Sequence, residues 1–400
     1  MQGSIAPGSG AAQALPPSTT ILQVLPALGH GGVERGTLEV AEAIVAAGGR
    51  ALVASDVGAN VGRLTQLGGE HVAMRLASKN PLTIRANGAA LADLIRRENV
   101  SLIHARSRAP AWSARRAAAL TGTPFVTTFH AAYNENGPLK KRYNSVMASG
   151  DRVIAISHFI ARLIRQRYGT PPNRLRVIHR GVDLKTFDPD AIGGGRITAL
   201  MRQWGLAAGA RVVLMPARLT RLKGHAVLIA AMASLLKLRS MPNLVCVMVG
   251  ADQGRENYRA ELQQYAQSLG LDGNRIVFAS HCDDIAAAMM LADVVVSAST
   301  EPEGFGRTLA EAGAMGKPVI ATAHGAAPEV IADNETGWLV MPGKAGPMAR
   351  ALEQAFTMSP RELQDMSNTA KIRAATLFSS KAMCDQTLEV YRELLSKAGS

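Results

Sequence analysis

The residues best suited to chemistry are two glutamates, Glu303 and Glu311, which stand eight positions apart with glycines between them. Gly304 and Gly306 lie where a loop leads into a helical pattern. Glycines there leave backbone N–H groups accessible, and these groups together with the helix dipole can bind phosphate oxygens. A carboxylate one turn inside the helix can accept hydrogen bonds from a ribose diol. The same pattern also fits an ordinary helix with acidic residues in its first turn.

A second charged cluster follows a predicted strand over residues 212–215. Arg218 and Lys223 lie in the segment 216–225, which opens a predicted helix over 226–236. A guanidinium and an ammonium group at the carboxyl end of a strand can hold a diphosphate between them. Two solvated loop charges would produce the same pattern, so these residues alone leave both interpretations open.

A third candidate site is the glycine-rich segment 29–32, between a predicted strand over 21–25 and a predicted helix over 33–47. Its glycines would let the backbone approach a ligand at the helix N-terminus, or would simply form a tight turn. The segment lacks the full G-x-G-x-x-G pattern, and Asp56 is the only acidic candidate for a ribose partner. A nicotinamide-dependent oxidoreductase is therefore disfavoured.

These clusters lie in a chain that alternates short apolar runs with helical patterns. Further strands are predicted over residues 51–54, 102–104, 124–129, 153–156, 177–178, 244–249, 276–278, 294–296 and 319–321. Further helices are predicted over 91–97, 111–120, 159–168, 255–269 and 309–315. Two similar halves of this kind predict an α/β protein with two doubly wound domains, which bind ligands beyond the carboxyl ends of their strands.

Length and composition agree with this organisation. A chain of 400 residues, 47% apolar and 19% charged, is too apolar for global disorder and long enough for two or three domains. Residues 188–195, with Pro189 and three glycines, are expected to form a linker, and residues 1–19 a disordered leader. The three cysteines form neither a metal pattern nor a disulfide framework, which favours a reducing cytoplasm. We expect no transmembrane helix.

The positive charge is concentrated in one half of the chain. Residues 1–200 carry 24 basic and 12 acidic side chains, whereas residues 201–400 carry 20 and 19. Such an imbalance favours contact with a polyanion, such as a nucleic acid, an anionic membrane or an acidic substrate. A nucleic acid is the weakest of these, because no aromatic stacking platform accompanies the charge.

Taken together and in order, these motifs resemble the family 4 retaining glycosyltransferases, also called group 1. The resemblance extends from about residue 21 to the end of the sequence. It rests on the E-x7-E segment 303–311 with 316–321, on Arg218 with Lys223 and Gly224, on the hinge-like segment 180–187, and on the segments 329–331 and 336–340. Two positions depart from the family pattern. Arg180 replaces a usual asparagine, and residues 278–280 lack a usual glycine, which affects the expected base and sugar contacts but not the expected fold.

The resemblance implies the GT-B architecture, in which two Rossmann-like doubly wound domains face a central cleft. We expect an N-terminal acceptor-side domain over residues 20–188 and a C-terminal nucleotide-sugar-binding domain over 189–379. A C-terminal helix over about 380–400 would pack back on the first domain.

The resemblance also implies roles for individual residues. Catalytic roles would fall to His130, Glu303, Arg218 and Lys223. Donor-binding roles would fall to Gly31, Gly32, Arg218, Lys223, Gly304, Phe305, Gly306, Thr308, Leu309 and Glu311. Residues 280–282 would lie near the nucleobase. Taken alone, His130 also fits a buried structural histidine.

The expected reaction is transfer of a hexosyl group, with retention, from a nucleotide-diphosphate sugar to a glycan or glycolipid acceptor. The Arg218–Lys223 pair could replace a metal at the diphosphate, so neither a metal nor another cofactor is expected. Lipopolysaccharide, exopolysaccharide or another cell-envelope glycan is the expected product, made in the cytoplasm or on the inner face of an anionic cytoplasmic membrane. The alternatives are a nucleotide-sugar epimerase of the same fold, a glycosyltransferase with a small soluble acceptor, and a non-catalytic sugar- or nucleotide-binding protein.

Overall fold

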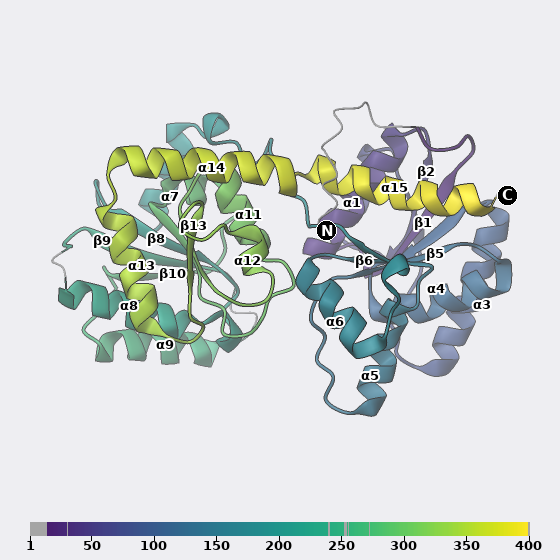
Figure 1. The fold of residues 1–400 in the computed structure, drawn as a ribbon, viewed down its shortest axis with the longest axis horizontal. Helices are drawn as coiled ribbons and strands as arrows, with labels where there is room; N and C mark the ends of the chain where they lie inside the picture. The colour runs from purple at the N-terminus through teal and green to yellow at the C-terminus, as the bar shows by residue number, and fades with distance from the viewer. Residues whose placement is uncertain are drawn as a thin grey trace. The chain divides into compact units, whose positions relative to one another are not determined.

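The chain folds into two α/β units. The structure is a computed structural model that describes residues 14–29, 31–238, 241–251, 254, 256–271 and 273–398. The first unit comprises the described residues up to 156 together with 160–178 and 381–398. The second comprises residues 157–159 and the described part of 179–380. Figure 1 shows a sheet with flanking helices in each unit.

The first unit contains a seven-stranded sheet in the order β3-β2-β1-β4-β5-β6-β7, in which the paired strands are parallel. Its strands are β1 (Thr20–Ala27), β2 (Arg50–Asp56), β3 (Glu70–Ala73), β4 (Leu102–Ala105), β5 (Phe125–Phe129), β6 (Arg152–Ala155) and β7 (Leu175–Val177). The flanking helices are α1 (Gly32–Ala46), α2 (Val61–Gln66), α3 (Pro81–Arg97), α4 (Arg108–Thr121), α5 (Pro138–Asn144), α6 (His158–Tyr168) and α15 (Ser380–Ala398), with 3-10 turns η1 (Ser145–Ala148) and η2 (Pro172–Arg174).

The second unit contains a six-stranded sheet in the order β10-β9-β8-β11-β12-β13, again with parallel pairs. Its strands are β8 (Arg211–Pro216), β9 (Leu244–Val249), β10 (Ile276–Ala279), β11 (Val294–Ser297), β12 (Val319–Thr322) and β13 (Gly337–Val340). Its helices are α7 (Gly194–Gln203), α8 (His225–Leu238), α9 (Glu256–Ser268), α10 (Ile285–Leu291), α11 (Arg307–Ala314), α12 (Ala327–Val330), α13 (Ala345–Thr357) and α14 (Pro360–Phe378), with 3-10 turns η3 (Pro189–Ala191) and η4 (Arg221–Lys223).

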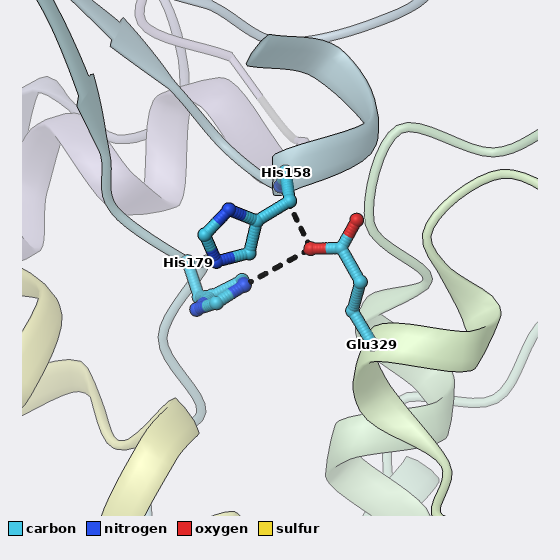
Figure 2. A group of neighbouring side chains, drawn as sticks. All are labelled: His158, His179 and Glu329. Carbon is cyan, nitrogen blue, oxygen red and sulfur yellow. Dashed lines mark hydrogen bonds and ion pairs between the residues drawn. The ribbon is translucent and has the colours of Figure 1, made fainter. Parts of the chain in front are cut away.

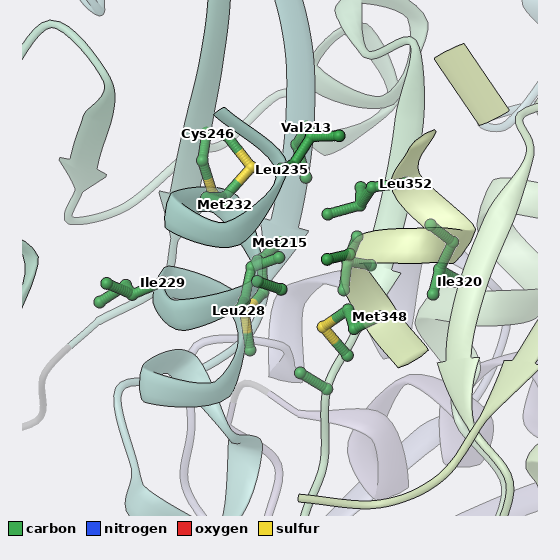
Figure 3. Close-up of a cluster of buried hydrophobic side chains, with 14 of the residues drawn as sticks. Val213, Met215, Leu228, Ile229, Met232, Leu235, Cys246, Ile320, Met348 and Leu352 are labelled. Atoms are coloured by element: carbon green, nitrogen blue, oxygen red, sulfur yellow. The ribbon is translucent and has the colours of Figure 1, made fainter. Parts of the chain in front are cut away.

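The core of the second unit explains why its central strands are almost continuously apolar. Val213 and Met215 of β8 are fully buried, as are Leu228 and Met232 of α8 and Leu352 of α13. Figure 3 shows these side chains meeting where α8 and α13 lie over the sheet. A parallel sheet covered by helices needs such strands, because neither of its faces is left to water.

The C-terminal helix α15 completes the first unit. Tyr391 is fully buried, and its hydroxyl lies 2.7 Å from Nδ1 of His104 on β4, whose Nε2 lies 2.7 Å from the Thr128 hydroxyl on β5. Burial, with a smaller contribution from the charge of Arg106, lowers the pKa of His104 well below its usual value. Glu393 on the same helix pairs with Arg176 at 2.8 Å. These contacts tie α15 directly to β4 and β7 and, through His104, to β5.

The fold class predicted from the sequence, two doubly wound Rossmann-like α/β sheets, is confirmed. Each predicted strand and helix overlaps an observed one. In both sheets the strand order reverses beside the first strand, between β1 and β4 and between β8 and β11. Ligands of open α/β sheets bind at the carboxyl ends of the strands on either side of such a reversal.

Two boundary predictions differ from the structure. The expected linker 188–195 is instead η3 followed by the start of α7, and the chain enters the second unit earlier, after Ile178. The predicted disordered leader, residues 1–19, is too long, because Leu15 is buried and its N–H donates to the Ala47 carbonyl at 2.9 Å. Residues 1–13 of that leader lie outside the described residues. Within the described part of the chain, no helix has the length and apolar character needed to cross a bilayer.

Candidate functional site

The best candidate site lies in the second unit, where its strand order reverses. β8 ends at Pro216 and the neighbouring β11 ends at Ser297, so the loops that follow these strands leave the same edge of the sheet. The N–H of Thr300 donates to the Leu222 carbonyl at 2.8 Å, which joins the two loops. Together they enclose a small pocket, the switch-point recess, lined by Met215, Pro216, Ala217, Lys223, Val296, Ser297, Glu303, Gly306 and Thr308.

A charged pair lies at this recess. The Lys223 ammonium is 2.8 Å from a carboxylate oxygen of Glu303, and both side chains are partly exposed. The Ser299 hydroxyl donates a hydrogen bond to the same carboxylate. Burial would raise the pKa of Glu303, but Lys223, Ser299 and the nearby His324 outweigh it and hold that pKa below its usual value. Glu303 is therefore an ionised acceptor at neutral pH.

Gly224 sets the position of Lys223. It follows η4 in a left-handed conformation, with φ of 75°, and a Cβ atom added to it would lie 1.9 Å from the Ala298 carbonyl oxygen. Only a glycine can bring the two loops this close. The following residue, His225, begins α8 and is fully buried. Burial lowers the pKa of His225 to about 4, so it is neutral at physiological pH.

A second glycine supports Glu303 from the other side. Gly325, in the loop after β12, has φ of 61°, and a Cβ atom there would lie 2.5 Å from the Glu303 carbonyl oxygen. The N–H of Ala326 donates to that same oxygen at 3.0 Å. The neighbouring His324 ring nitrogen Nε2 lies 2.9 Å from the Ser299 carbonyl oxygen. The loop after β12 therefore holds the loop that contains Glu303 in place.

The predicted E-x7-E segment is arranged largely as expected. Gly306 caps α11 with φ of 84°, Thr308 lines the recess, and Glu311 lies one turn inside the helix and is buried. Two residues of this segment present no side chain to a ligand. The Leu309 side chain is buried and its N–H donates to the Gly306 carbonyl at 3.0 Å. The Phe305 ring is also buried, so only its backbone is available to a ligand.

Arg218 is the second residue after β8 and its side chain is exposed. It stands at the same edge of the sheet as Lys223, in the loop that enters η4. The predicted cation pair thus comes from one loop, but only Lys223 reaches the recess in this structure.

The remaining predicted site residues belong to the first unit. Gly31 and Gly32 stand at the start of α1, after β1 and beside the reversal between β1 and β4. His130 follows β5 at the carboxyl edge of the same sheet. All three therefore lie at the ligand-binding edge that the topology of this unit defines. Residue 30 lies outside the described residues.

Sequence reasoning missed the residues that hold the loop after His130. The Arg108 guanidinium lies 4.4 Å from the Tyr133 ring centroid and donates to Asn144 Oδ1 at 2.9 Å. Arg167 donates to the Tyr133 carbonyl at 2.9 Å. Ser299, His324 and Gly325 were also missed in the second unit. The one available signal was their position just after β11 and β12, where parallel sheets gather functional side chains.

Comparisons with known proteins place the chain in a family. Residues 197–373 match the family described as Glycosyl transferases group 1, and residues 30–186 match Glycosyltransferase Family 4. The crystal structure of a glycosyltransferase from Rickettsia africae shares 36% sequence identity, with a TM-score of 0.87 over 94% of this chain and 99% of that one. The structure of Anabaena Alr3699/HepE in complex with UDP and glucose shares 25% identity, with a TM-score of 0.81 over 94% of this chain and 100% of that one.

Curated relatives match a smaller part of the chain. The D-inositol 3-phosphate glycosyltransferase of Nocardioides sp. is 34% identical over 62% of this chain and 54% of its own length. The match thus spans about half the length of such relatives. Fold and site together define a GT-B protein, with two Rossmann-like units and ligand loops at the strand reversals. Within that class, the chain belongs to the group 1 glycosyltransferases, family 4.

Proposed function

We propose that this protein transfers a hexosyl group from a nucleotide-diphosphate sugar and that the second unit binds this donor at the switch-point recess. The observation that carries the proposal is the Lys223–Glu303 pair, 2.8 Å apart at the strand reversal. A cation and an ionised carboxylate side by side match the two halves of a nucleotide sugar. The ammonium suits the diphosphate, and the carboxylate suits the sugar hydroxyls. The solved relative from Anabaena, which holds UDP and glucose, supports a donor of this class.

The proposed chemistry follows from where charge develops. Departure of the nucleoside diphosphate builds negative charge on its phosphate oxygens. Lys223 and the N-terminus of α11 would stabilise that charge, most strongly in the transition state, and Arg218 would have to turn toward the recess to join them. These groups would take the role that a metal has in other transferases, so we propose a metal-independent reaction. Glu311 would bind the ribose and His130 would lie near the transferred sugar, as the family resemblance implies.

We further propose retention of the anomeric configuration by front-face substitution. Glu303 lines the recess, and its oxygens already bond Lys223 and Ser299. Such a carboxylate is better suited to holding sugar hydroxyls than to attacking the anomeric carbon.

The donor proposal is tested by thermal shift with UDP-, GDP- and ADP-sugars, followed by analysis of the products. One donor class at 100 times its dissociation constant should stabilise the protein by about 2.7 kcal/mol. Release of the nucleoside diphosphate should then depend on an added glycan or glycolipid acceptor, and proton NMR should show a retained anomeric configuration. Conversion of the donor without any acceptor would instead identify an epimerase. The absence of both stabilisation and turnover with all three classes would refute the proposal.

We propose that the acceptor is a lipid-linked or cell-envelope glycan, reached by docking the first unit on the anionic inner face of the cytoplasmic membrane. α5 presents Leu139, which is 82% exposed, next to the exposed Lys140, Lys141 and Arg142. An apolar side chain amid cations is suited to an anionic bilayer surface. Arg167 on α6 is engaged elsewhere, because it donates to the Tyr133 carbonyl at 2.9 Å.

Co-sedimentation with phosphatidylglycerol-containing vesicles tests this docking. Each lysine near an anionic surface contributes about 1 kcal/mol, so Lys140→Gln with Lys141→Gln should weaken binding about 30-fold. The matched control is Lys237→Gln with Lys344→Gln, which removes two exposed charges from the second unit. Wild-type protein that does not bind in a salt-sensitive manner, or an equal loss in the control, would remove the membrane from the proposal.

A further inference from the structure

Three side chains of the second unit converge outside the switch-point recess. His158 is the first residue of α6, His179 follows β7, and Glu329 lies on α12. One ligand atom from each residue lies within 4.8 Å of the other two, and His179 Nε2 is 3.3 Å from Glu329 Oε2. Figure 2 shows the two imidazoles and the carboxylate gathered around one point. The sequence does not predict this group, because its members are up to 171 positions apart.

The type and spacing of these groups fit a transition-metal ion. Two imidazoles and one carboxylate are a common zinc ligand set, with bonds of about 2.0–2.2 Å and a fourth position left for water. In a tetrahedral site with such bonds, neighbouring ligand atoms are about 3.3–3.5 Å apart. The distance between His179 Nε2 and Glu329 Oε2 is in this range, and the remaining distances are within 4.8 Å.

The carboxylate is already oriented for this role. Oε2 of Glu329 accepts from the His158 N–H at 2.7 Å, and Oε1 accepts from the Phe159 N–H at 2.6 Å. Each carboxylate oxygen keeps a further lone pair for a metal. Such outer hydrogen bonds fix the orientation of metal-binding carboxylates. Arg373, the neighbouring cation on α14, bonds the Glu329 and Val330 carbonyls.

The surroundings also suit a charged, partly shielded centre. The His179 ring packs edge-on against Phe378, with ring centroids 5.3 Å apart, and lies 5.8 Å from Phe305. His179 and Glu329 are both partly buried, so the group is partly shielded from water.

Capping of a backbone turn explains part of this arrangement. The two N–H bonds account for Glu329, and its pair with His179 accounts for one imidazole. Neither accounts for the His158 ring, whose centroid lies 5.8 Å from that of His179 and which bonds no other described side chain. We propose that His158, His179 and Glu329 form a binding site for a divalent transition-metal ion, with zinc as the best fit and water as the fourth ligand.

The proposed ion would be structural and separate from sugar transfer, and it does not depend on the function proposed above. The residue before His158, Ser157, donates its hydroxyl hydrogen to the Gly304 carbonyl at 2.7 Å. An ion at His158 would hold residues 157–159 against α12 and would thereby brace the glycine-rich loop that begins at Glu303. Metal binding should thus stabilise the second unit.

The test uses tag-free full-length protein, stripped of metal with a chelator and titrated with Zn²⁺ by calorimetry and with Co²⁺ by visible absorption. We expect one ion per chain and the intense d–d bands of tetrahedral cobalt. His158→Ala removes one exposed ligand with little risk to folding and should weaken Zn²⁺ binding about 100-fold. Glu329→Gln should also weaken it, but this variant also alters the backbone cap.

The matched control is His281→Ala. His281 lies 2.9 Å from Asp283 and beside Cys282. These residues form another exposed histidine–carboxylate pair that could attract zinc. This variant should bind Zn²⁺ as the wild type does. Binding weaker than about 100 μM in the wild type, unchanged binding in His158→Ala, or loss in His281→Ala would each overturn the proposal.

Discussion

Replacing Lys223 with methionine is expected to lower kcat/KM for the nucleotide-sugar donor by about 10²–10³. Among the residues that the structure describes, the Lys223 ammonium group, 2.8 Å from Glu303, is the one cation that lines the switch-point recess. Methionine keeps most of the side-chain length and removes the charge that would stabilise the departing diphosphate. Steady-state turnover of the donor selected by thermal shift measures the effect.

Two further variants separate loss of that charge from damage to the loop. Arg221→Met removes a cation two positions away, which pairs with Glu261 at 2.6 Å on the surface, and should leave turnover within about twofold. Lys223→Met leaves the Glu303 carboxylate charge without its cation. The double variant Lys223→Met with Glu303→Gln removes that charge as well. If the double variant recovers near-wild-type turnover, Lys223 only neutralises Glu303, and its assignment to the diphosphate is wrong.

Gly224→Ala is expected to destabilise the second unit by about 2–5 kcal/mol and to abolish donor binding. The left-handed backbone costs any other residue about 1–2 kcal/mol, and forcing a methyl group against packed backbone adds about 1–3. Here the methyl carbon would lie 1.9 Å from the Ala298 carbonyl oxygen. The loop that carries Lys223 must therefore move away from β11. Urea unfolding and donor titration measure the two effects.

Gly205→Ala is the matched control for backbone strain. Gly205 has φ of 65°, close to the 75° of Gly224, and a Cβ atom there would meet nothing within 4 Å. This variant should lose only about 1–2 kcal/mol and bind the donor normally. Equal destabilisation by the two substitutions would show that the contact with Ala298 is not what requires glycine at Gly224.

The sequence predicted the sheets better than the connections between them. Strands such as β9 are continuous apolar runs, and that pattern suffices because both faces of a parallel sheet are covered. The four-residue helix α12 and the short, partly exposed strand β3 were missed, and so were the long helices α13 and α14. The triple glycine at 193–195 predicted a linker, but helix α7 begins within it. Helix formation there is decided by packing against α10, which local propensity does not encode.

The residues of the candidate site also differ in whether the sequence can predict them. Glu303, Lys223 and Glu311 could be found because motif spacing along the chain fixes their place on a loop or a helix. The contact between Lys223 and Glu303 could not, because it depends on the adjacency of β8 and β11. The supporting residues Ser299 and Gly325 and the group formed by His158, His179 and Glu329 depend equally on long-range packing.

The chain order of the two units constrains how the protein is made. The first unit needs α15, whose Tyr391 reaches His104, yet some two hundred residues of the second unit are synthesised before that helix. Domains usually fold in the order in which they leave the ribosome. Here the second unit can fold first, while the first unit exposes the apolar surface that Leu388 and Tyr391 later cover. The nascent chain must therefore keep a nearly complete sheet soluble until its last helix emerges, and this interval is when we expect it to depend most on chaperones.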